Sequence, residues 1–339
     1  MPKENKTAII PLYITHSGCP HLCIYCNQKI ASDHEEPIKP QDIKIKIEKA
    51  LALVDRTKYN QVEIAFYGGS FTALDIKEQE ALLLPIQEFI LSGQVDSIRV
   101  STRPDYINEE VLSLLKSMNV KTIEIGAQSM NDEVLKLAKR GHSSADIINA
   151  SRLIKKIGFM LSIHLMIGLP VDTPEISINS AKSVIELQPD FVRIHPTLVL
   201  KGTQLEEEYQ AGRFKSWDSE QVLNTLKEML KLFEEASIKV IRIGLQPSEG
   251  LLLKENVISG FNHPSMRELC ESLIFLDEMT EMIDSSEGKD IVFLINPSDI
   301  SKVLGHKRFN FIKLTEQYPN HEICYETDMK IPKGEIGLK

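Results

Sequence analysis

The chain has 339 residues, of which 42% are hydrophobic and 26% charged, a composition typical of a globular protein long enough for one large barrel or two ordinary domains. No apolar run approaches the ~20 residues that a membrane-spanning helix needs, and the first residues lack a signal-peptide pattern, so we expect a cytoplasmic protein with no membrane partner. The net charge of -9 argues against a protein that coats nucleic acid through a broad basic surface.

A cluster of cysteines follows the first predicted strand, at residues 9–15. Cys19, Cys23 and Cys26 lie within eight residues of one another, and the whole chain has only five cysteines. Three thiolates on one loop can hold three irons of a 4Fe-4S cluster, which usually has four cysteine ligands, so one iron is left open for chemistry. A zinc knuckle, a redox pair of Cys23 and Cys26, and buried structural thiols are the alternatives.

Strands and helices alternate along most of the chain. Strand-like runs lie at residues 9–15, 62–67, 97–102, 122–126, 161–167, 191–198 and 239–244. Helical stripes of apolar residues lie between them, at residues 43–54, 78–91, 108–118, 144–157, 176–187 and 219–236. This alternation predicts an α/β fold, a partial or complete (βα) TIM-like barrel with its helices outside a parallel sheet. An open doubly wound sheet is the alternative, although no Gly-x-Gly-x-x-Gly turn supports it.

Active-site residues of such a barrel lie at the carboxyl ends of its strands. Segments with unusual residues occur at these ends: the cysteine loop, Gly68-Gly69-Ser70, Ser101 to Asp105, Gly126 to Ser129, Gly168 to Pro170, and His195 to Thr197. Glycine and proline at a strand end are often plain turn residues, but their joint placement predicts one functional rim. His164 and His195 lie on predicted strands, where each is either a core histidine or a side chain that faces the substrate.

The alternation changes after about residue 246. Residues 247–264 connect to a predicted helix at 267–283, a strand at 290–295, a loop and helix at 297–317, and a last strand at 322–325. We therefore predict a barrel domain over residues 1–246 and a small C-terminal α/β appendage over residues 247–339. A basic run in the appendage is either a solvated surface or an RNA-binding patch. Its candidate contacts are Lys302, His306, Lys307, Arg308 and Lys313.

The cysteine spacing C-x3-C-x2-C, with Tyr25 just before the last cysteine, resembles the signature of the radical S-adenosylmethionine (SAM) enzymes. The likeness extends over residues 9 to about 246, and within that superfamily it is strongest to the catalytic subunit of elongator, which modifies wobble uridines in tRNA. The segments that resemble it are Gly68-Gly69-Ser70-Phe71-Thr72, Arg103-Pro104-Asp105-Tyr106, Gln128-Ser129, Arg140-Gly141-His142 and Pro196-Thr197-Leu198-Val199. The oxygen-independent coproporphyrinogen oxidases share a weaker version of the pattern.

The resemblance implies that Cys19, Cys23 and Cys26 bind a 4Fe-4S cluster and that SAM chelates its open iron. The implied SAM contacts are Tyr25, Gly68, Gly69, Ser70, Ser101, Arg103, Gln128 and Arg140. It also implies reductive cleavage of SAM to a 5′-deoxyadenosyl radical, a flavodoxin- or ferredoxin-type electron donor, and tRNA or another RNA as substrate.

Two departures from the family pattern limit this reading. Ser101 stands where these enzymes usually have a glutamate that contacts SAM, so the contact is either a hydroxyl hydrogen bond or is made by another group. We also see no segment like the acetyltransferase domain of elongator, and we do not expect acyl transfer from this chain alone. Two alternative functions stay open: a small-molecule radical SAM oxidoreductase resembling coproporphyrinogen oxidase, and a non-catalytic iron–sulfur or zinc-binding protein.

Overall fold

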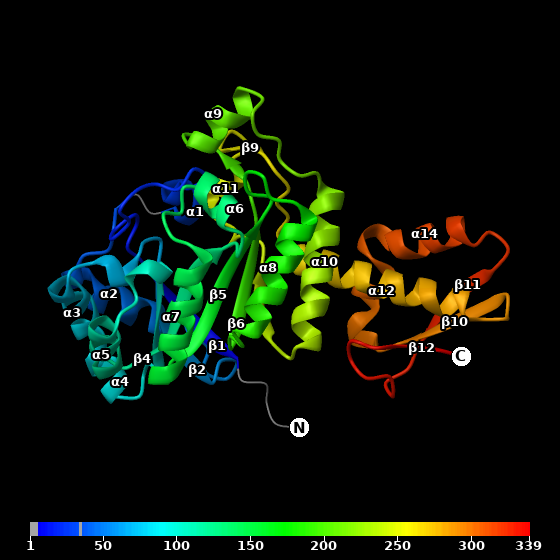
Figure 1. The fold of residues 1–339 in the computed structure, drawn as a ribbon. Coiled ribbons are helices and arrows are strands. Elements are labelled where there is room, and N and C mark those ends of the chain that lie inside the picture. Colours follow the sequence, from blue (N-terminus) through cyan, green and yellow to red (C-terminus); the bar gives the residue numbers. More distant parts are fainter. Residues whose placement is uncertain (1–5, 34–35) are drawn as a thin grey trace.

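The computed structural model describes residues 6–33 and 36–339, and its centre is a sheet of seven parallel strands (Figure 1). Residues 1–5 lie outside the described residues. They belong to the N-terminal segment in which the sequence shows no signal-peptide pattern. The seven strands are β1 (Thr7–Tyr13), β2 (Gln61–Tyr67), β3 (Ser97–Thr102), β4 (Val120–Gln128), β5 (Met160–Ile167), β6 (Phe191–Pro196) and β8 (Lys239–Ile243). They pair in sequential order, which excludes the doubly wound alternative, in which the strand order reverses.

The sheet curls without closing. Within residues 6–33 and 36–339, β1 and β8 each have a single neighbour in this sheet, so it forms a half-barrel. The barrel prediction is confirmed in its partial form.

Helices cover the outer face of the half-barrel, and Figure 1 shows α7, α8 and α10 packed along the strands. The covering helices are α2 (Pro40–Leu51), α3 (Ile76–Leu83), α4 (Gln87–Leu91), α5 (Glu109–Ser117), α7 (Ser144–Ile157), α8 (Pro174–Glu186) and α10 (Ser219–Glu235). Their apolar stripes meet the outward-facing strand residues in one main core, in which Phe66, Leu83 and Phe233 are fully buried. The single helix predicted at 78–91 is wrong: the 3-10 turn η2 (Leu84–Ile86) interrupts it, because Pro85 has no backbone N–H to continue the hydrogen-bond ladder.

Short elements that were not predicted gather at the carboxyl end of the sheet. They are α1 (Gln28–Ser32), η1 (Phe71–Ala73), η3 (Pro104–Tyr106), α6 (Asp132–Leu137), β7 (Val199–Leu200), α9 (Gln204–Gln210), α11 (Glu249–Leu252) and β9 (Val257–Ser259). The strand predicted at 191–198 ends at Pro196, and β7 then pairs with β9 in a separate antiparallel ribbon.

Hydrogen bonds connect the segments after β6 and β8 to the segment after β1 at this end. The amide of Leu205 donates to the carbonyl of Ile24 at 2.8 Å, and the Asp33 carboxylate accepts from the amides of Glu249 and Gly250, both at 2.6 Å. The segments after β6 and β8 therefore hold the segment after β1.

A second, smaller core lies in the C-terminal part of the chain. It contains α12 (Met266–Asp284), β10 (Asp290–Ile295), η4 (Pro297–Asp299), α13 (Ile300–Leu304), η5 (His306–Arg308), α14 (Phe309–Gln317), β11 (Glu322–Thr327) and β12 (Ile336–Leu338). Strand β10 pairs in parallel with β11 and antiparallel with β12, a three-residue strand that was not predicted.

Helix α12 contributes to both cores. Its first turns place Met266 and Cys270 in the main core, and residues from Phe275 onward belong to the small one. The division of the chain between residues 246 and 247 remains a prediction. No helix in the described ranges is both long and apolar enough to span a membrane.

Candidate active site

The cysteine loop, residues 16–27, packs directly against the glycine-containing loop after β2. Gly69 is required by this packing, because a Cβ at that position would lie 2.5 Å from the carbonyl oxygens of both Ile14 and Ser17. Gly18 has φ +71°, and its missing side chain leaves room for the Ser70 carbonyl. The amide of Ser70 donates to the carbonyl of Ser17 at 2.9 Å. The two loops therefore form one unit that fixes the backbone just before Cys19.

Gly68 differs from Gly69. It has φ +86°, yet a Cβ there would meet its neighbours only at ordinary distances, the nearest being the Tyr13 ring at 3.5 Å. Of the two predicted SAM-contacting glycines, Gly68 thus has room for a Cβ, whereas the backbone of the cysteine loop occupies the place of a Cβ at Gly69.

The three cysteine side chains are half-buried and share one electrostatic environment. Burial and the neighbouring Cys23 raise the pKa of Cys19, and burial followed by the other two thiols raises the pKa of Cys26 to about 12. The three thiols are thus near enough to one another for their charges to interact. Metal binding requires the thiolate, so iron entering this loop would displace protons from these groups.

The donor set fits a 4Fe-4S cluster, in which each cysteine binds a different iron. A zinc knuckle needs four ligands around one ion. Among the described residues, no group of three or more His, Cys, Asp or Glu side chains, the three cysteines included, is arranged so that it could hold a metal ion.

Two of the predicted SAM contacts lie close together here: Arg140 contacts Cys23, and Gln128 lies beside Arg140 at Gly126. Arg140 is buried; its Nη1 lies 3.0 Å from the Cys23 Sγ and 3.4 Å from the Tyr25 hydroxyl, and its Nη2 donates to the Gly126 carbonyl at 2.6 Å. A Cβ on Gly126 would lie 3.0 Å from the Gln128 amide nitrogen and 3.2 Å from Arg140 Nη2, so the missing side chain makes room for both groups.

Two buried polar atoms at this point have no hydrogen-bond partner among the described residues: the Nε of Arg140 and the Oε1 of Gln128. Gln128 itself has φ +71° at the end of β4, beside a bulge in its pairing with β5. Buried polar atoms are nearly always hydrogen-bonded, so this pair indicates space for a polar ligand. These atoms and the three thiols fit SAM and the cluster.

Three other predicted SAM contacts are engaged within the protein. The Ser70 hydroxyl is fully buried, lies 3.1 Å from the Thr102 hydroxyl and accepts from the amide of Arg103. Arg103 forms a two-pronged ion pair with Asp105, at 3.0 and 2.8 Å. The Ser101 hydroxyl donates to Glu124 at 2.9 Å. A carboxylate thus stands beside Ser101, supplied by the neighbouring strand β4.

A charged network that sequence reasoning missed fills the concave face of the half-barrel. Arg99 pairs with Glu63 at 2.8 Å, and Arg193 pairs with Glu124 at 3.0 Å; Arg99 also lies 3.8 Å from Glu124. The two arginines hold the pKa of the buried Glu124 carboxyl at about 2, against a desolvation that acts in the opposite direction. The sequence pattern that could have revealed this network is the occurrence of single charged residues within otherwise apolar strands.

His164 and His195 come together on the same concave face. Their rings lie 4.3 Å apart in an edge-to-face arrangement, and the Nε2 of each is buried with no partner in the described part of the chain. Burial, assisted by Arg193, lowers the pKa of His164 to about 3. Burial also lowers the pKa of His195 well below its ordinary value, so both imidazoles are neutral at pH 7.

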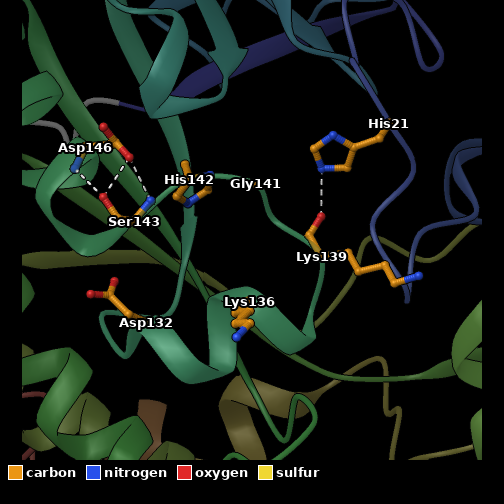
Figure 2. Close-up of a pocket in the computed structure, with 8 residues that line it drawn as sticks. All are labelled: His21, Asp132, Lys136, Lys139, Gly141, His142, Ser143 and Asp146. Carbon is orange, nitrogen blue, oxygen red and sulfur yellow. Dashed lines mark hydrogen bonds between the residues drawn. The ribbon is translucent and has the colours of Figure 1, made fainter.

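A cavity of about 560 Å³ lies outside the cysteine loop, between that loop and the start of α7 (Figure 2). Figure 2 shows His21, from the cysteine loop, bonded through Nε2 to the Lys139 carbonyl at 2.7 Å. The lining includes Gly141 and His142 but none of the cysteines, nor Arg140. The cavity therefore borders the cysteine loop at His21 and contains none of the predicted metal ligands.

The predicted basic patch is partly exposed. Lys302 is engaged, because its Nζ lies 2.8 Å from Glu271 and 3.8 Å from Asp299. The remaining four candidates, His306, Lys307, Arg308 and Lys313, are exposed. The exposed ring of Phe309 lies among them, with Lys313 Nζ 5.9 Å from its centroid. An exposed patch of cations around an aromatic ring is chemically suited to RNA.

Comparison with known proteins identifies two family models along the chain. The model of the radical SAM superfamily matches residues 13–180, and the model of the radical SAM C-terminal domain matches residues 189–274. The tRNA uridine(34) acetyltransferase of Methanocaldococcus infernus is 26% identical over 260 residues, which are 66% of this chain and 49% of that protein. Elongator complex protein 3 of Homo sapiens is 26% identical over 306 residues, 77% of this chain and 55% of that protein.

The chain spans about half the length of these curated relatives. Among solved structures, the archaeal Methanocaldococcus infernus Elp3 with an N-terminal deletion superposes with a TM-score of 0.63 at 22% identity. That match covers 81% of this chain and 64% of the solved one.

Proposed function

The chain belongs to the radical SAM superfamily and has the predicted likeness to elongator proteins, and on that premise we propose that the half-barrel binds SAM beside a 4Fe-4S cluster held by Cys19, Cys23 and Cys26. The observation that supports the proposal most strongly is the group around Gly126. There the buried Arg140 reaches Cys23, and its Nε and the Gln128 Oε1 point to a missing polar ligand.

Each residue of this group has a chemical role in the proposal. Arg140 binds the methionyl carboxylate, since a guanidinium pairs with a carboxylate through two parallel hydrogen bonds. Gln128 hydrogen-bonds the ribose hydroxyls, and the Tyr25 backbone and ring contact the adenine. The backbone at Gly68 allows close approach of the methionyl amine, since glycine carries no side chain. When bound, the reduced cluster supplies the electron that cleaves SAM to methionine and a 5′-deoxyadenosyl radical.

Ser70, Ser101 and Arg103 have a supporting role in the same proposal. Their polar groups already have protein partners, so they fix the loops around the ligand and make at most a second hydrogen bond to it. The charge of Arg103 also lowers the pKa of Cys19, against the larger effect of burial, and so favours the thiolate.

We further propose tRNA as the substrate. The relatives that match this chain include proteins named for uridine 34 of tRNA, although the chain corresponds to only about half of their length. The exposed residues His306, Lys307, Arg308 and Lys313 would hold the RNA backbone. The enzyme would work in the cytoplasm with a flavodoxin- or ferredoxin-type donor that supplies one electron per cleavage.

The test is anaerobic reconstitution with iron and sulfide, reduction with dithionite, and measurement of 5′-deoxyadenosine and methionine after addition of SAM. We expect both products from the wild-type protein and neither from Cys23→Ala. Cys324→Ala is the matched control, since it removes an exposed thiol far along the chain. A cluster that forms without SAM cleavage, with or without bulk tRNA, would favour the non-catalytic alternative.

A further inference from the structure

The concave face of the half-barrel contains a cation without an anionic partner, Arg242 on β8. The β6–β8 pairing places Arg242 beside Arg193, so both side chains leave the sheet on the same face. Arg193 is neutralised by Glu124 at 3.0 Å. Arg242 forms no ion pair with any carboxylate in the described ranges, and its Nε and Nη2 donate only to the carbonyls of Gly244 and Leu245, at 3.2 and 3.3 Å.

An unpaired guanidinium in this half-buried position is costly. Burial lowers the pKa of Arg242, and the positive charge of Arg193 lowers it further. The group nevertheless stays charged at pH 7, because an arginine is not deprotonated in proteins. A half-buried cation with no carboxylate beside it in the described ranges is suited to bind an anion that comes from outside the protein.

Neutral hydrogen-bonding groups stand next to this cation. The β5–β6 pairing places His164 beside Arg193, which itself lies beside Arg242, and the ring of His195 lies 4.3 Å from that of His164. A neutral imidazole offers one donor and one acceptor, and the Nε2 of both rings has no partner in the described residues. The Arg193 guanidinium in turn lies 5.3 Å from the centroid of the Tyr67 ring.

We propose that Arg242 binds an oxyanion of the substrate and that His164 and His195 bind a neutral polar edge of the same molecule. The proposal deepens the proposed function and rests on it. With RNA as substrate, the oxyanion is a backbone phosphate and the neutral edge belongs to a nucleobase turned into the half-barrel. A carboxylate on a small molecule has the same chemistry, so the test must separate these two sources.

The test compares the affinity of the full-length protein for three probes by isothermal titration calorimetry: uridine 5′-monophosphate, uridine and succinate. We expect the wild-type protein to bind the monophosphate at least about tenfold more tightly than uridine, the factor expected for a hydrogen-bonded charge pair. Arg242→Gln should abolish this preference, whereas Arg213→Gln should keep it, because Arg213 is exposed and pairs with Glu208. His195→Phe should weaken both nucleoside probes equally and leave the preference unchanged.

Circular dichroism would verify that each variant is folded. If Arg242→Gln does not fold, Arg242→Lys replaces it, and this variant should reduce the preference for the monophosphate over uridine without abolishing it. Equal wild-type affinities for uridine and its monophosphate, or a preference that survives in Arg242→Gln, would overturn the phosphate assignment. Arg242-dependent binding of succinate alone would retain the oxyanion subsite and assign it to a small carboxylate. The binding measurement needs neither a bound cluster nor turnover. Its result would therefore still test the Arg242 subsite if the protein failed to cleave SAM.

Discussion

Substitution of Gly18 by alanine tests whether backbone packing between two loops positions the cysteines. Gly18 has φ +71°, and a Cβ there would overlap the Ser70 carbonyl. Gly93 also has φ +71°, but a Cβ at that position meets nothing within 4 Å. The pair of variants therefore separates the cost of the left-handed backbone from the cost of the overlap.

The left-handed conformation costs a non-glycine residue about 1–2 kcal/mol, which is the whole expected loss for Gly93→Ala. Overpacking against a rigid backbone adds about 1–3 kcal/mol, so Gly18→Ala should lose about 2–5 kcal/mol of unfolding free energy. Urea denaturation measures both values. Because Gly18 directly precedes Cys19, Gly18→Ala should also retain less iron after reconstitution, and Gly93→Ala should retain as much as the wild type. Equal stability and equal iron content in the two variants would refute the reasoning.

Three further predictions concern other parts of the molecule. Glu124→Gln leaves Arg99 and Arg193 short of a buried counter-charge and should cost about 3–5 kcal/mol in urea denaturation. The pKa of Glu124 is about 2 in the folded protein against an ordinary 4.5, so the ionised carboxylate stabilises the folded state fully above pH 4.5 and this stabilisation is lost as the pH falls toward 2. The stability of Glu124→Gln should lack this part of the pH dependence. Identical pH profiles of stability for the variant and the wild type would contradict the assignment. Arg140→Gln should weaken SAM binding by about tenfold or more in equilibrium dialysis, with the exposed Arg152→Gln as control, and unchanged binding would remove Arg140 from the SAM site. The double variant Lys307→Glu, Arg308→Glu should bind tRNA more weakly in filter-binding assays, and its binding should depend less on salt. Lys330→Glu, on another exposed segment, should change neither property. Equal effects of the double variant and the control would argue for general electrostatics instead of a specific patch.

The element pattern was largely readable from the sequence, because it depends on local periodicity. The strand at residues 97–102 and the helix at 144–157 agree with β3 and α7 at both ends. The helix at 78–91 failed because an apolar stripe continues across Pro85, although the backbone cannot. Short elements such as β7 and β12 could not be predicted, since two or three residues have no period of their own and form strands only because a partner lies beside them.

The candidate site likewise has a part that the sequence predicts and a part that it does not. The cysteine spacing is local, so the sequence itself indicated a cluster loop and, through its motifs, the radical SAM superfamily. The contact of Arg140 with Cys23 joins residues 117 positions apart, and the approach of Gln128 and Arg140 around Gly126 requires a positive φ and a strand bulge. Sequence resemblance named these residues, but it did not reveal which of their atoms lack partners.

By itself, the sequence determined the strand and helix order, the thiol-rich loop and the family, because these depend on neighbours along the chain. Only the tertiary structure decided that Glu124 stands beside Ser101, that Lys302 is engaged by Glu271, and that Arg242 has no counter-charge among the described residues. Whether a charge is paired depends on side chains that parallel strands bring together from distant segments, and that register exists only once the sheet has formed.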